Sequence, residues 1–460
     1  GSNFLAFTEV SNIFSILFSG SKRTQVIKKN IAGSFLIKGL SIVTTLLLVP
    51  LTINLLDQEK YGIWMTIFSI VSWFNMMDIG IGNGFRNKFA EAVAIGDNDL
   101  AKEYVQTFYS SMGIIAFGFF LVFSIVNPFL NWNTILNLPN SFDENISLIV
   151  WFVFGLFCVQ LYIKNISTLL LSLQKTTYSN SLLLYANITS LVFILLLQRI
   201  NIFSLFSIAL AFMLAPILVY FIASINLFHG DLKRFKPSLF YLPKRKYLND
   251  LIGIGMKFFL IQITTIVMYS SSNIIITQLY GPAEVTPYNV AFRLYSSIQV
   301  IFSIIVTPFW SAFTEANATQ DYSWIKKSIK KLIYIWLIFS LGVVFLWFIS
   351  PYVFNIWVGS SVIIPYFLSL QFAIFVLINS WSSIFSFFVA GIGKIKLSLF
   401  VALFQLIVYV PLALLLAEIM KFNTTGVIMA TNLILLLPAI LLAFQTKKII
   451  DNKAYGIWNK

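Results

Sequence analysis

The stretch DIGIGNGFRNKFAEAVAIGD, residues 78–97, decides the architecture predicted for the whole chain. It closes a long apolar run with an acidic residue, three alternating glycines and two basic residues. Part of it returns at a spacing of 224 residues, the difference between positions 85 and 309. The recurring pairs are Phe85/Phe309, Phe89/Phe313, Glu91/Glu315, Ala92/Ala316, Ala94/Ala318, Asp97/Asp321 and Lys102/Lys326. This recurrence predicts two related halves.

The composition predicts a protein that crosses a membrane many times. Of 460 residues, 58% are hydrophobic and only 10% are charged, and no globular core could hide so much apolar surface. About twelve apolar runs have roughly the 20 residues that a membrane helix needs. They cover approximately 31–55, 61–83, 106–127, 146–172, 178–198, 203–227, 250–278, 286–312, 332–350, 363–390, 397–418 and 424–445.

The basic residues predict the orientation of these spans. With the N-terminus inside, 24 of the 31 Lys and Arg lie on the cytosolic side, three lie outside and four lie within spans. Cytosolic loops of membrane proteins carry such an excess of Lys and Arg. Both termini are therefore predicted to be cytosolic, and the positive charge does not indicate a nucleic-acid partner.

The longest basic connector, residues 232–249, divides the chain into two halves of six spans. An even number of spans gives both halves the same orientation, so their symmetry axis is expected along the membrane normal, with a central cavity between them. The fold class predicted is an all-α integral membrane protein with two pseudo-symmetric six-helix lobes. The predicted units are an N-terminal cytosolic or interfacial segment, an N-lobe, a linker, a C-lobe and a cytosolic tail, at 1–30, 31–228, 229–249, 250–446 and 447–460.

Several kinds of chemistry are disfavoured by composition. The single Cys158 excludes an intramolecular disulfide or a cysteine metal cluster, and the single His229 disfavours histidine catalysis and zinc ligation. The glycines after Asp78 do not form a nucleotide loop, because no strand precedes them and no Walker lysine follows. No cofactor is predicted. Gly80 and Gly84 instead fit a close approach of the second span to a neighbouring helix, and residues 86–97 are expected to form a cytosolic turn.

Charges inside the spans are the best candidates for function, because a charge near the bilayer centre costs about 2.5 to 3.5 kcal/mol. Lys38 and Lys257 lie about eight residues into the first and seventh spans, roughly 10 to 12 Å from the cytosolic surface. Arg293 lies about eight residues into the eighth span from the outside, and its guanidinium suits a diphosphate. These three residues are predicted to bind an anionic substrate. The alternatives are snorkelling to the headgroups or a structural ion pair.

Further candidates lie in and near the opening stretch. Arg86 and Asn83 are placed at the cytosolic mouth as substrate contacts, although a purely topological role is an equal alternative for Arg86. Asp78 is the only acid well inside a span, and it is predicted to couple transport to an ion, with helix capping or an ion pair as the alternative. Lys164, near the end of the fourth span, is expected to snorkel to the lipid headgroups rather than to bind substrate.

The motif Tyr61-Gly62-Ile63-Trp64, followed by residues 78–87 and then by Gly96-Asp97, resembles the Wzx-type flippases of O-antigen and polysaccharide repeat units. These belong to a superfamily that also contains the multidrug exporters called MATE transporters. The resemblance covers almost the whole chain, from about residue 22. It implies a substrate of undecaprenyl diphosphate carrying a short oligosaccharide, moved outward across a bacterial inner membrane through a V-shaped cavity that opens alternately to each side.

Two other function classes, a multidrug exporter and a membrane enzyme, fit the sequence less well than a flippase. The nearest rival is a multidrug exporter of the same fold, although a cation exporter favours acidic cavity residues and the charge inside these spans is mainly basic. An enzyme, such as a membrane polysaccharide polymerase, is disfavoured by short external loops. The partners expected are the lipid-linked oligosaccharide, membrane lipids and a coupling ion, H⁺ or Na⁺, with the chain acting as a monomer.

Overall fold

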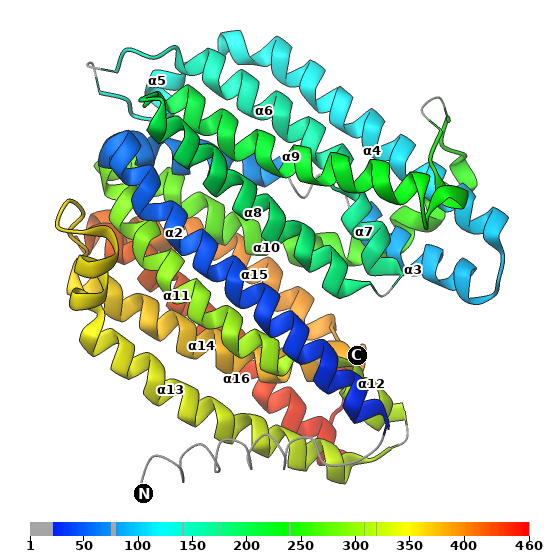
Figure 1. Cartoon of the computed structure of the whole chain (residues 1–460). Helices are drawn as coiled ribbons and strands as arrows, with labels where there is room; N and C mark the ends of the chain where they lie inside the picture. Colours follow the sequence, from blue (N-terminus) through cyan, green and yellow to red (C-terminus); the bar gives the residue numbers. More distant parts are fainter. Residues whose placement is uncertain are drawn as a thin grey trace, which may run out of the picture.

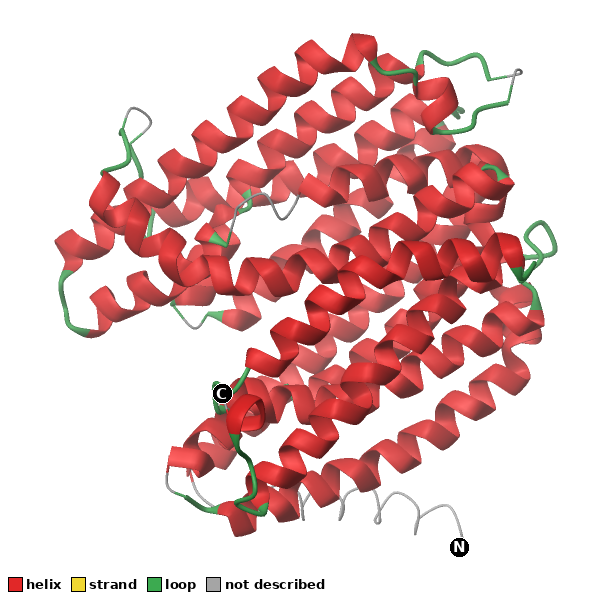
Figure 2. Ribbon diagram, turned by 180° about the vertical axis from the view of Figure 1, so that it is seen from behind, coloured by secondary structure: helices red, strands yellow, loops and turns green. Residues whose placement is uncertain are grey.

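The computed structural model describes residues 22–74, 80–139, 142–173, 175–238, 241–307, 309–318 and 320–459. Within these ranges the chain forms helices and loops and no strand, as Figure 2 shows. Residues 1–21 of the predicted N-terminal segment 1–30, and Asp78, lie outside the described residues, while residues 22–30 of that segment are part of helix α2.

The long helices follow the predicted spans, and Figure 1 shows them running side by side. Their bounds are α2 Lys22–Trp73, α3 Ile81–Ala94, α4 Asn98–Val126, α5 Trp132–Ile135, α6 Ile146–Ile163, α7 Asn165–Ser172, α8 Thr176–Arg199, α9 Leu205–His229, α10 Arg245–Tyr280, α11 Val285–Val306, α12 Phe309–Ala318, α13 Tyr322–Val358, α14 Tyr366–Gly391, α15 Lys396–Leu414 and α16 Asn423–Ile450. Short turns of other helix types include η3 Lys233–Phe235, η4 Pro282–Glu284 and η5 Leu415–Ile419.

The number of spanning helices agrees with the sequence. Ten helices in the described ranges are long and apolar enough to cross a membrane. One of them, Phe35–Trp73, covers most of the first two predicted spans, which are separated where Asp57 leaves the helical conformation (φ 67°, ψ 174°). The 36-residue α10 matches the predicted seventh span. The predicted fold class, an all-α membrane protein of about twelve spans, is confirmed.

The helices pack as two groups. The N-terminal group contains α4, α6, α8, α9 and the first half of α2, and the C-terminal group contains α11, α13, α14, α15 and α16. Helix α10 lies between them and packs against α3, α2 and α15, while α2 also packs against α11 (Figure 1). The two groups therefore meet along α2, α10 and α11.

The prediction for the end of the second span is wrong. Helix α2 ends at Trp73, and residues 86–94 lie in a separate helix, α3, rather than in a turn. The turn is confined to the residues after Ala94. Helix α3 begins after Gly80, because the left-handed backbone of this glycine (φ 70°) does not fit into an α-helix. Glycine itself is neither strongly apolar nor charged, so the run of glycines does not mark this boundary in the sequence.

Three prolines inside helices free backbone carbonyls that side chains then satisfy. A proline lacks the N–H that would bond the carbonyl four residues earlier. The carbonyl of Leu46, freed by Pro50, accepts from the Trp357 indole at 2.7 Å, so this bond joins α2 to α13. Two more cases are the carbonyls of Ile434 (freed by Pro438, donor Gln405, 3.3 Å) and Trp347 (freed by Pro351, donor Ser350, 2.8 Å).

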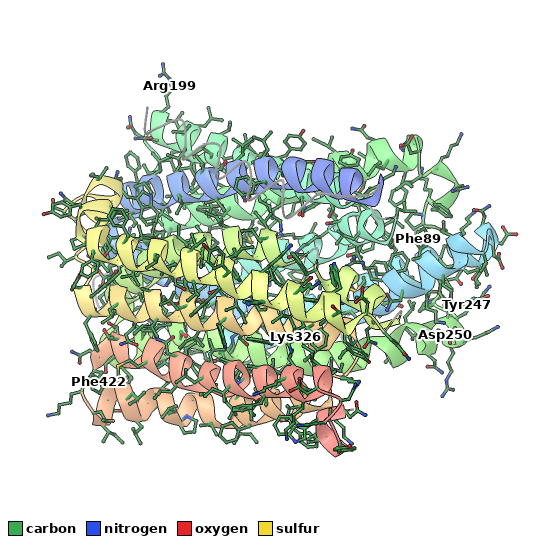
Figure 3. All side chains as sticks on the ribbon, turned by 90° about the horizontal axis from the view of Figure 1, so that it is seen from below. Phe89, Arg199, Tyr247, Asp250, Lys326 and Phe422 are labelled. Carbon is green, nitrogen blue, oxygen red and sulfur yellow. The ribbon has the colours of Figure 1, made fainter. Side chains whose placement is uncertain are left out.

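The basic connector between the two halves is fixed against α4. The Tyr241 hydroxyl and the Lys244 ammonium both donate to the Glu103 carboxylate, at 2.5 and 3.0 Å. The hydrogen bond to Glu103 raises the pKa of Lys244 above its ordinary value. Figure 3 shows Tyr247 and Asp250 near Phe89 at one end of the molecule, with Phe422 at the opposite end. The connector therefore lies at one end of the molecule.

Candidate functional site

A cavity of about 240 Å³ lies among α2, α6, α8 and α9, in the N-terminal group. One side chain from the C-terminal group, Arg293 of α11, reaches into it. The lining residues are Thr45, Leu48, Val49, Thr52, Tyr61, Trp64, Met65, Phe68, Gln160, Lys164, Leu183, Ala186, Asn187, Ser190, Phe212, Met213, Pro216, Tyr220 and Arg293. The cavity therefore lies where the two groups meet.

Each helix presents one face to this cavity. Positions 45, 48, 49 and 52 of α2 repeat at helical spacing, as do 183, 186, 187 and 190 of α8. The amide of Asn187 donates to the hydroxyls of Ser41 and Thr45, at 2.8 and 3.3 Å, which fixes α8 against the first half of α2. Trp64 stacks on Phe212 with ring centroids 5.6 Å apart and stiffens the opposite wall.

The polar lining is cationic and rich in hydrogen-bonding groups. Arg293 and Lys164 carry the charge, and hydroxyls and amides come from residues such as Gln160 and Tyr220. None of the residues that line the cavity is acidic. In the described ranges no ion pair to Arg293 is found, and no group of three or more His, Cys, Asp or Glu could hold a metal. The cavity is thus built to attract an anion with many oxygen atoms.

Of the predicted site residues whose side chains the structure describes, one lines the cavity and two do not. Arg293 lines the cavity. Lys38 is half-buried on α2, seven residues before Thr45 and outside the lining. Arg86 is exposed on α3 and also lies outside the lining.

Three other predictions fall where the structure describes no side chain. Asp78 lies outside the described residues altogether. The backbones of Asn83 and Lys257 lie in α3 and α10, but their side chains are outside the described part. The roles of these residues stay predictions.

Lys164 is the lining residue that sequence reasoning missed. It lies at the break between α6 and α7, and Gln160, one turn earlier, lies on the same helix face. The signal in the sequence was the polar pair itself, spaced four residues apart at the end of an apolar run. Depth in the span does not distinguish a contact with the lipid headgroups from a contact with the cavity, so the sequence by itself favours snorkelling.

The two groups are in close contact beside this cavity, where η4 joins α10 to α11. The amide of Gln58 donates to the carbonyl of Ala283 at 3.1 Å, and Thr286 donates back to the carbonyl of Gln58 at 2.6 Å. A Cβ atom added to Gly62 would lie 1.8 Å from the carbonyl oxygen of Pro282. Position 62 therefore requires glycine, because any side chain would separate these segments.

Deeper hydrogen bonds continue this contact between the second half of α2 and α10. The hydroxyls of Thr66 and Thr277 are 2.7 Å apart, and the amide of Asn273 donates to the Ser69 hydroxyl at 2.7 Å. All four residues are buried. Buried polar groups that satisfy one another hold two surfaces in a specific register.

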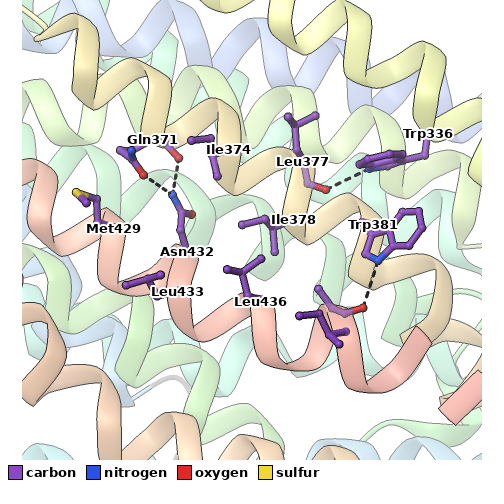
Figure 4. Close-up of a pocket in the computed structure, with 12 residues that line it drawn as sticks. Trp336, Gln371, Ile374, Leu377, Ile378, Trp381, Met429, Asn432, Leu433 and Leu436 are labelled. Atoms are coloured by element: carbon purple, nitrogen blue, oxygen red, sulfur yellow. Dashed lines mark hydrogen bonds between the residues drawn. The ribbon is translucent and has the colours of Figure 1, made fainter. Parts of the chain in front are cut away.

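A second pocket, of about 520 Å³, lies between α13, α14 and α16 in the C-terminal group (Figure 4). Its two indoles, Trp336 and Trp381, donate to the carbonyls of Leu377 and Ala439, at 3.1 and 3.2 Å. Only Gln371 and Asn432 add polar side chains besides the indoles, and Asn432 donates to the backbone and side-chain oxygens of Gln371. This pocket contains no charged lining residue, in contrast to the cavity around Arg293.

The sequence resembles proteins of polysaccharide export. A family model described as polysaccharide biosynthesis protein matches residues 27–314, more than half of the chain. A Yersinia pseudotuberculosis protein named for O-antigen export is 24% identical over 369 residues, which cover 76% of this chain and 79% of that protein. A Salmonella typhimurium protein named for O-antigen transport is 20% identical over 305 residues, covering 66% and 69%.

The fold resembles that of solved transporters. An inward-facing multidrug resistance MATE transporter of the MOP superfamily superposes with a TM-score of 0.71 and 15% identity, covering 91% of this chain and 95% of that one. A MOP superfamily transporter from Pyrococcus furiosus, described as having a binding pocket of reversed polarity, gives a TM-score of 0.66 at 16% identity, covering 94% and 97%. The expected likeness to Wzx-type flippases is therefore confirmed. The chain belongs to the polysaccharide biosynthesis protein family, and its fold is like that of the solved MATE transporters.

Proposed function

We propose that this protein exports a lipid-linked oligosaccharide, carried on undecaprenyl diphosphate, from the cytosolic to the outer leaflet of a bacterial inner membrane. The observation that carries the proposal is the cavity around Arg293. A guanidinium without an acidic partner in the described ranges, surrounded by hydroxyls and amides, is suited to a diphosphate and the sugars attached to it.

The proposed mechanism is alternating access between the two helix groups. Arg293 comes from the C-terminal group and most of the cavity wall from the N-terminal group, so a substrate bound there would contact both. Opening the cavity to the outside would require the contacts at Gly62 and the buried Thr66–Thr277 and Asn273–Ser69 hydrogen bonds to separate. The prenyl tail stays in the lipid, since the cavity is far too small to enclose it.

A substitution series at Arg293 tests the function. In a strain that lacks this gene, the wild-type protein should restore surface polysaccharide, and Arg293→Ala should lower it at least about tenfold, because charge-assisted hydrogen bonds contribute about 1.5 to 3 kcal/mol. Arg293→Lys should keep part of the export, since it keeps the charge and loses the two-pronged geometry.

Arg199→Ala is the matched control, because this arginine ends α8 and projects away from the molecule (Figure 3). It should export as the wild type does. Normal export by Arg293→Ala would contradict the proposed site, and failure of the wild-type gene to restore polysaccharide would contradict the function. Efflux of cationic dyes by the wild type would favour the multidrug alternative, which the cationic lining disfavours.

Coupling to a proton or sodium gradient through Asp78 is part of this proposal. Because the structure does not describe Asp78, its support is the sequence alone, where it is the acid placed within the second predicted span. In proteoliposomes, Asp78→Asn should abolish ion flux that depends on substrate. Flux equal to that of the wild type would remove Asp78 from coupling.

A further inference from the structure

The segment between α4 and α6 contains a short folded piece, residues 127–138, which we call the strap. It includes the four-residue helix α5. Figure 1 shows α5 at the opposite end of the molecule from α3. The distribution of basic residues predicts that this end faces outside.

The strap is anchored to the N-terminal group. The amide of Asn127 donates to the carbonyl of Ser147 in α6 at 3.2 Å, and the indole of Trp132 donates to the side-chain oxygen of Asn127 at 2.7 Å. The side chains of Trp132 and Leu136 are buried. These contacts hold the strap in one conformation on the N-terminal group.

Three hydrogen bonds join the strap to the last turn of α10. The amide of Asn137 donates to the carbonyl of Thr277 at 3.1 Å. In the opposite direction, the amide of Gln278 donates to the carbonyls of Thr134 and Ile135, at 3.0 and 2.5 Å. Carbonyls at the end of a helix lack partners within that helix, so the end of α5 is a ready acceptor for this amide.

The last part of α10 is bound to the C-terminal group. The hydroxyls of Ser272 and Tyr409 in α15 are 2.6 Å apart, and the hydroxyl of Tyr280 donates to the carbonyl of Ala417 in η5 at 2.7 Å. The strap bonds therefore cross from one helix group to the other. They lie at the same end as the contact between α2 and η4, because η4 directly follows α10.

The strap bonds differ in exposure from the hydrogen bonds between α2 and α10. Those bonds are buried, whereas Asn137 and Gln278 are exposed. Water can replace an exposed hydrogen bond when its two partners separate, but a buried polar group that loses its partner without gaining water is costly. The strap is therefore suited to a contact that forms and breaks repeatedly.

We propose that the strap holds the two helix groups together while the cavity is closed to the outside, and that its bonds to α10 break when the cavity opens. This inference rests on the alternating access of the proposed function and names a segment that controls it. The strap bonds stabilise only the closed arrangement, so weakening them shifts the population toward the arrangement that is open to the outside.

Two substitutions break the strap bonds with little change in side-chain volume. Asn137→Asp and Gln278→Glu each replace a donating amide by a carboxylate that faces carbonyl oxygens. Opening would be measured as the rate at which an external, membrane-impermeant maleimide labels a cysteine in the cavity. This cysteine is introduced by Ser190→Cys in a Cys158→Ser background. Each variant should raise the labelling rate about three- to tenfold, which is the size of effect that one hydrogen bond has on an equilibrium.

Asn131→Asp is the matched control. Asn131 accepts a hydrogen bond from the backbone N–H of Thr134, and aspartate caps a helix in the same way. This variant adds the same charge to the strap and should be labelled at the parent rate. Labelling at the parent rate by both Asn137→Asp and Gln278→Glu would overturn the role of the strap. An equal increase in Asn131→Asp would also overturn it, because the charge alone would then be the cause.

Reversible crosslinking of the strap to α10 tests the same inference through export. The pair Thr134→Cys/Gln278→Cys lies at exposed positions and would be joined by a short bifunctional methanethiosulfonate in the Cys158→Ser background. The crosslink should lower new surface polysaccharide at least about tenfold, because the groups can no longer separate there, and a reductant should restore it. The two single-cysteine variants, treated identically, should export normally.

The outcomes separate this inference from the function. Normal export with a complete crosslink would overturn the role of the strap and leave the proposed function standing. Failure of the wild-type gene to restore polysaccharide would contradict the function itself. The labelling experiment requires no substrate, so it decides about the strap in either case.

Discussion

The corner between α3 and α4 and the corner between α12 and α13 are built alike. Asp97 accepts a hydrogen bond from the backbone N–H of Leu100 at 2.9 Å, and Asp321 accepts one from Trp324 at 3.0 Å. The two aspartates are one of the pairs that recur at a spacing of 224 residues. The recurrence therefore encodes two copies of a capped corner.

The turns before Asp97 and Asp321 have the same backbone conformation, although different residue types adopt it. Gly96 and Gln320 both have left-handed conformations, with φ of 79° and 56°. In both corners the N–H of the aspartate bonds the carbonyl five residues earlier, at 3.1 and 2.8 Å. Glycine adopts this conformation without strain, whereas glutamine does so at a cost.

The corners differ in what their helices touch. Helix α12 packs mainly against α14 and α13 of its own group, whereas α3 packs against α10, and a Cβ on Gly84 would lie 1.9 Å from the carbonyl oxygen of Leu251. Position 84 has no glycine counterpart, because position 308 is a proline. The shared residues thus build the corner, and the unshared glycine permits the contact with α10.

Replacing the phenylalanines that recur in both corners should have the largest effect on stability. Phe89 and Phe313 are both 0% exposed, so replacing either by alanine should lower the free energy of unfolding in mixed micelles by about 3 to 5 kcal/mol. Phe129→Ala, at an 84% exposed position, is the control and should change little. A loss below about 1 kcal/mol at only one of the two buried positions would show that the corners are not equivalent.

Gly84→Ala tests the unshared contact. The added methyl group meets a backbone oxygen that cannot rotate away, so stability should fall by about 1 to 3 kcal/mol, and crosslinking of α3 to α10 through introduced cysteines should decrease. The control is Gly118→Ala in α4, where a Cβ meets nothing within 4 Å and stability should rise slightly. If both variants changed stability equally, the contact with Leu251 would not be the reason for glycine at position 84.

Asp97→Ala and Asp321→Ala should each lower stability by about 1 kcal/mol, because each leaves the first turn of a helix without its side-chain acceptor. The free energy of unfolding would be measured for both. Asparagine, which also caps helices, should restore most of the loss at either position. Recovery at one corner alone would mean that the second aspartate has a different role.

The smallest effect is expected from exchanging the turn residues. Gln320→Gly should raise stability by at most about 1 kcal/mol, since glycine removes left-handed strain but adds freedom to the unfolded chain. Gly96→Gln should lower it by about 1 to 2 kcal/mol. Thermal unfolding should show a higher Tm for Gln320→Gly and a lower Tm for Gly96→Gln. If both Tm values moved in the same direction, backbone strain would be excluded as the cause.

The sequence alone determined the number of spans and the repeated corner. These features depend on local properties, namely the length of an apolar run and the order of a few residues around a turn. The sequence also predicted that Gly84 lies close to a neighbouring helix. It did not predict that this helix is α10. The boundary of α3 was missed because glycines give no clear hydropathy signal.

Only the tertiary structure decided which charges share a cavity. Arg293 was predicted as a substrate contact and lines the cavity, Lys164 was assigned to the headgroups and lines it too, and Lys38 does not line it. Depth in a span follows from counting residues, but the side to which a residue points relative to the other helices depends on how α2, α6, α8, α9 and α11 pack. That packing depends on contacts between residues far apart in the chain, which no local pattern records.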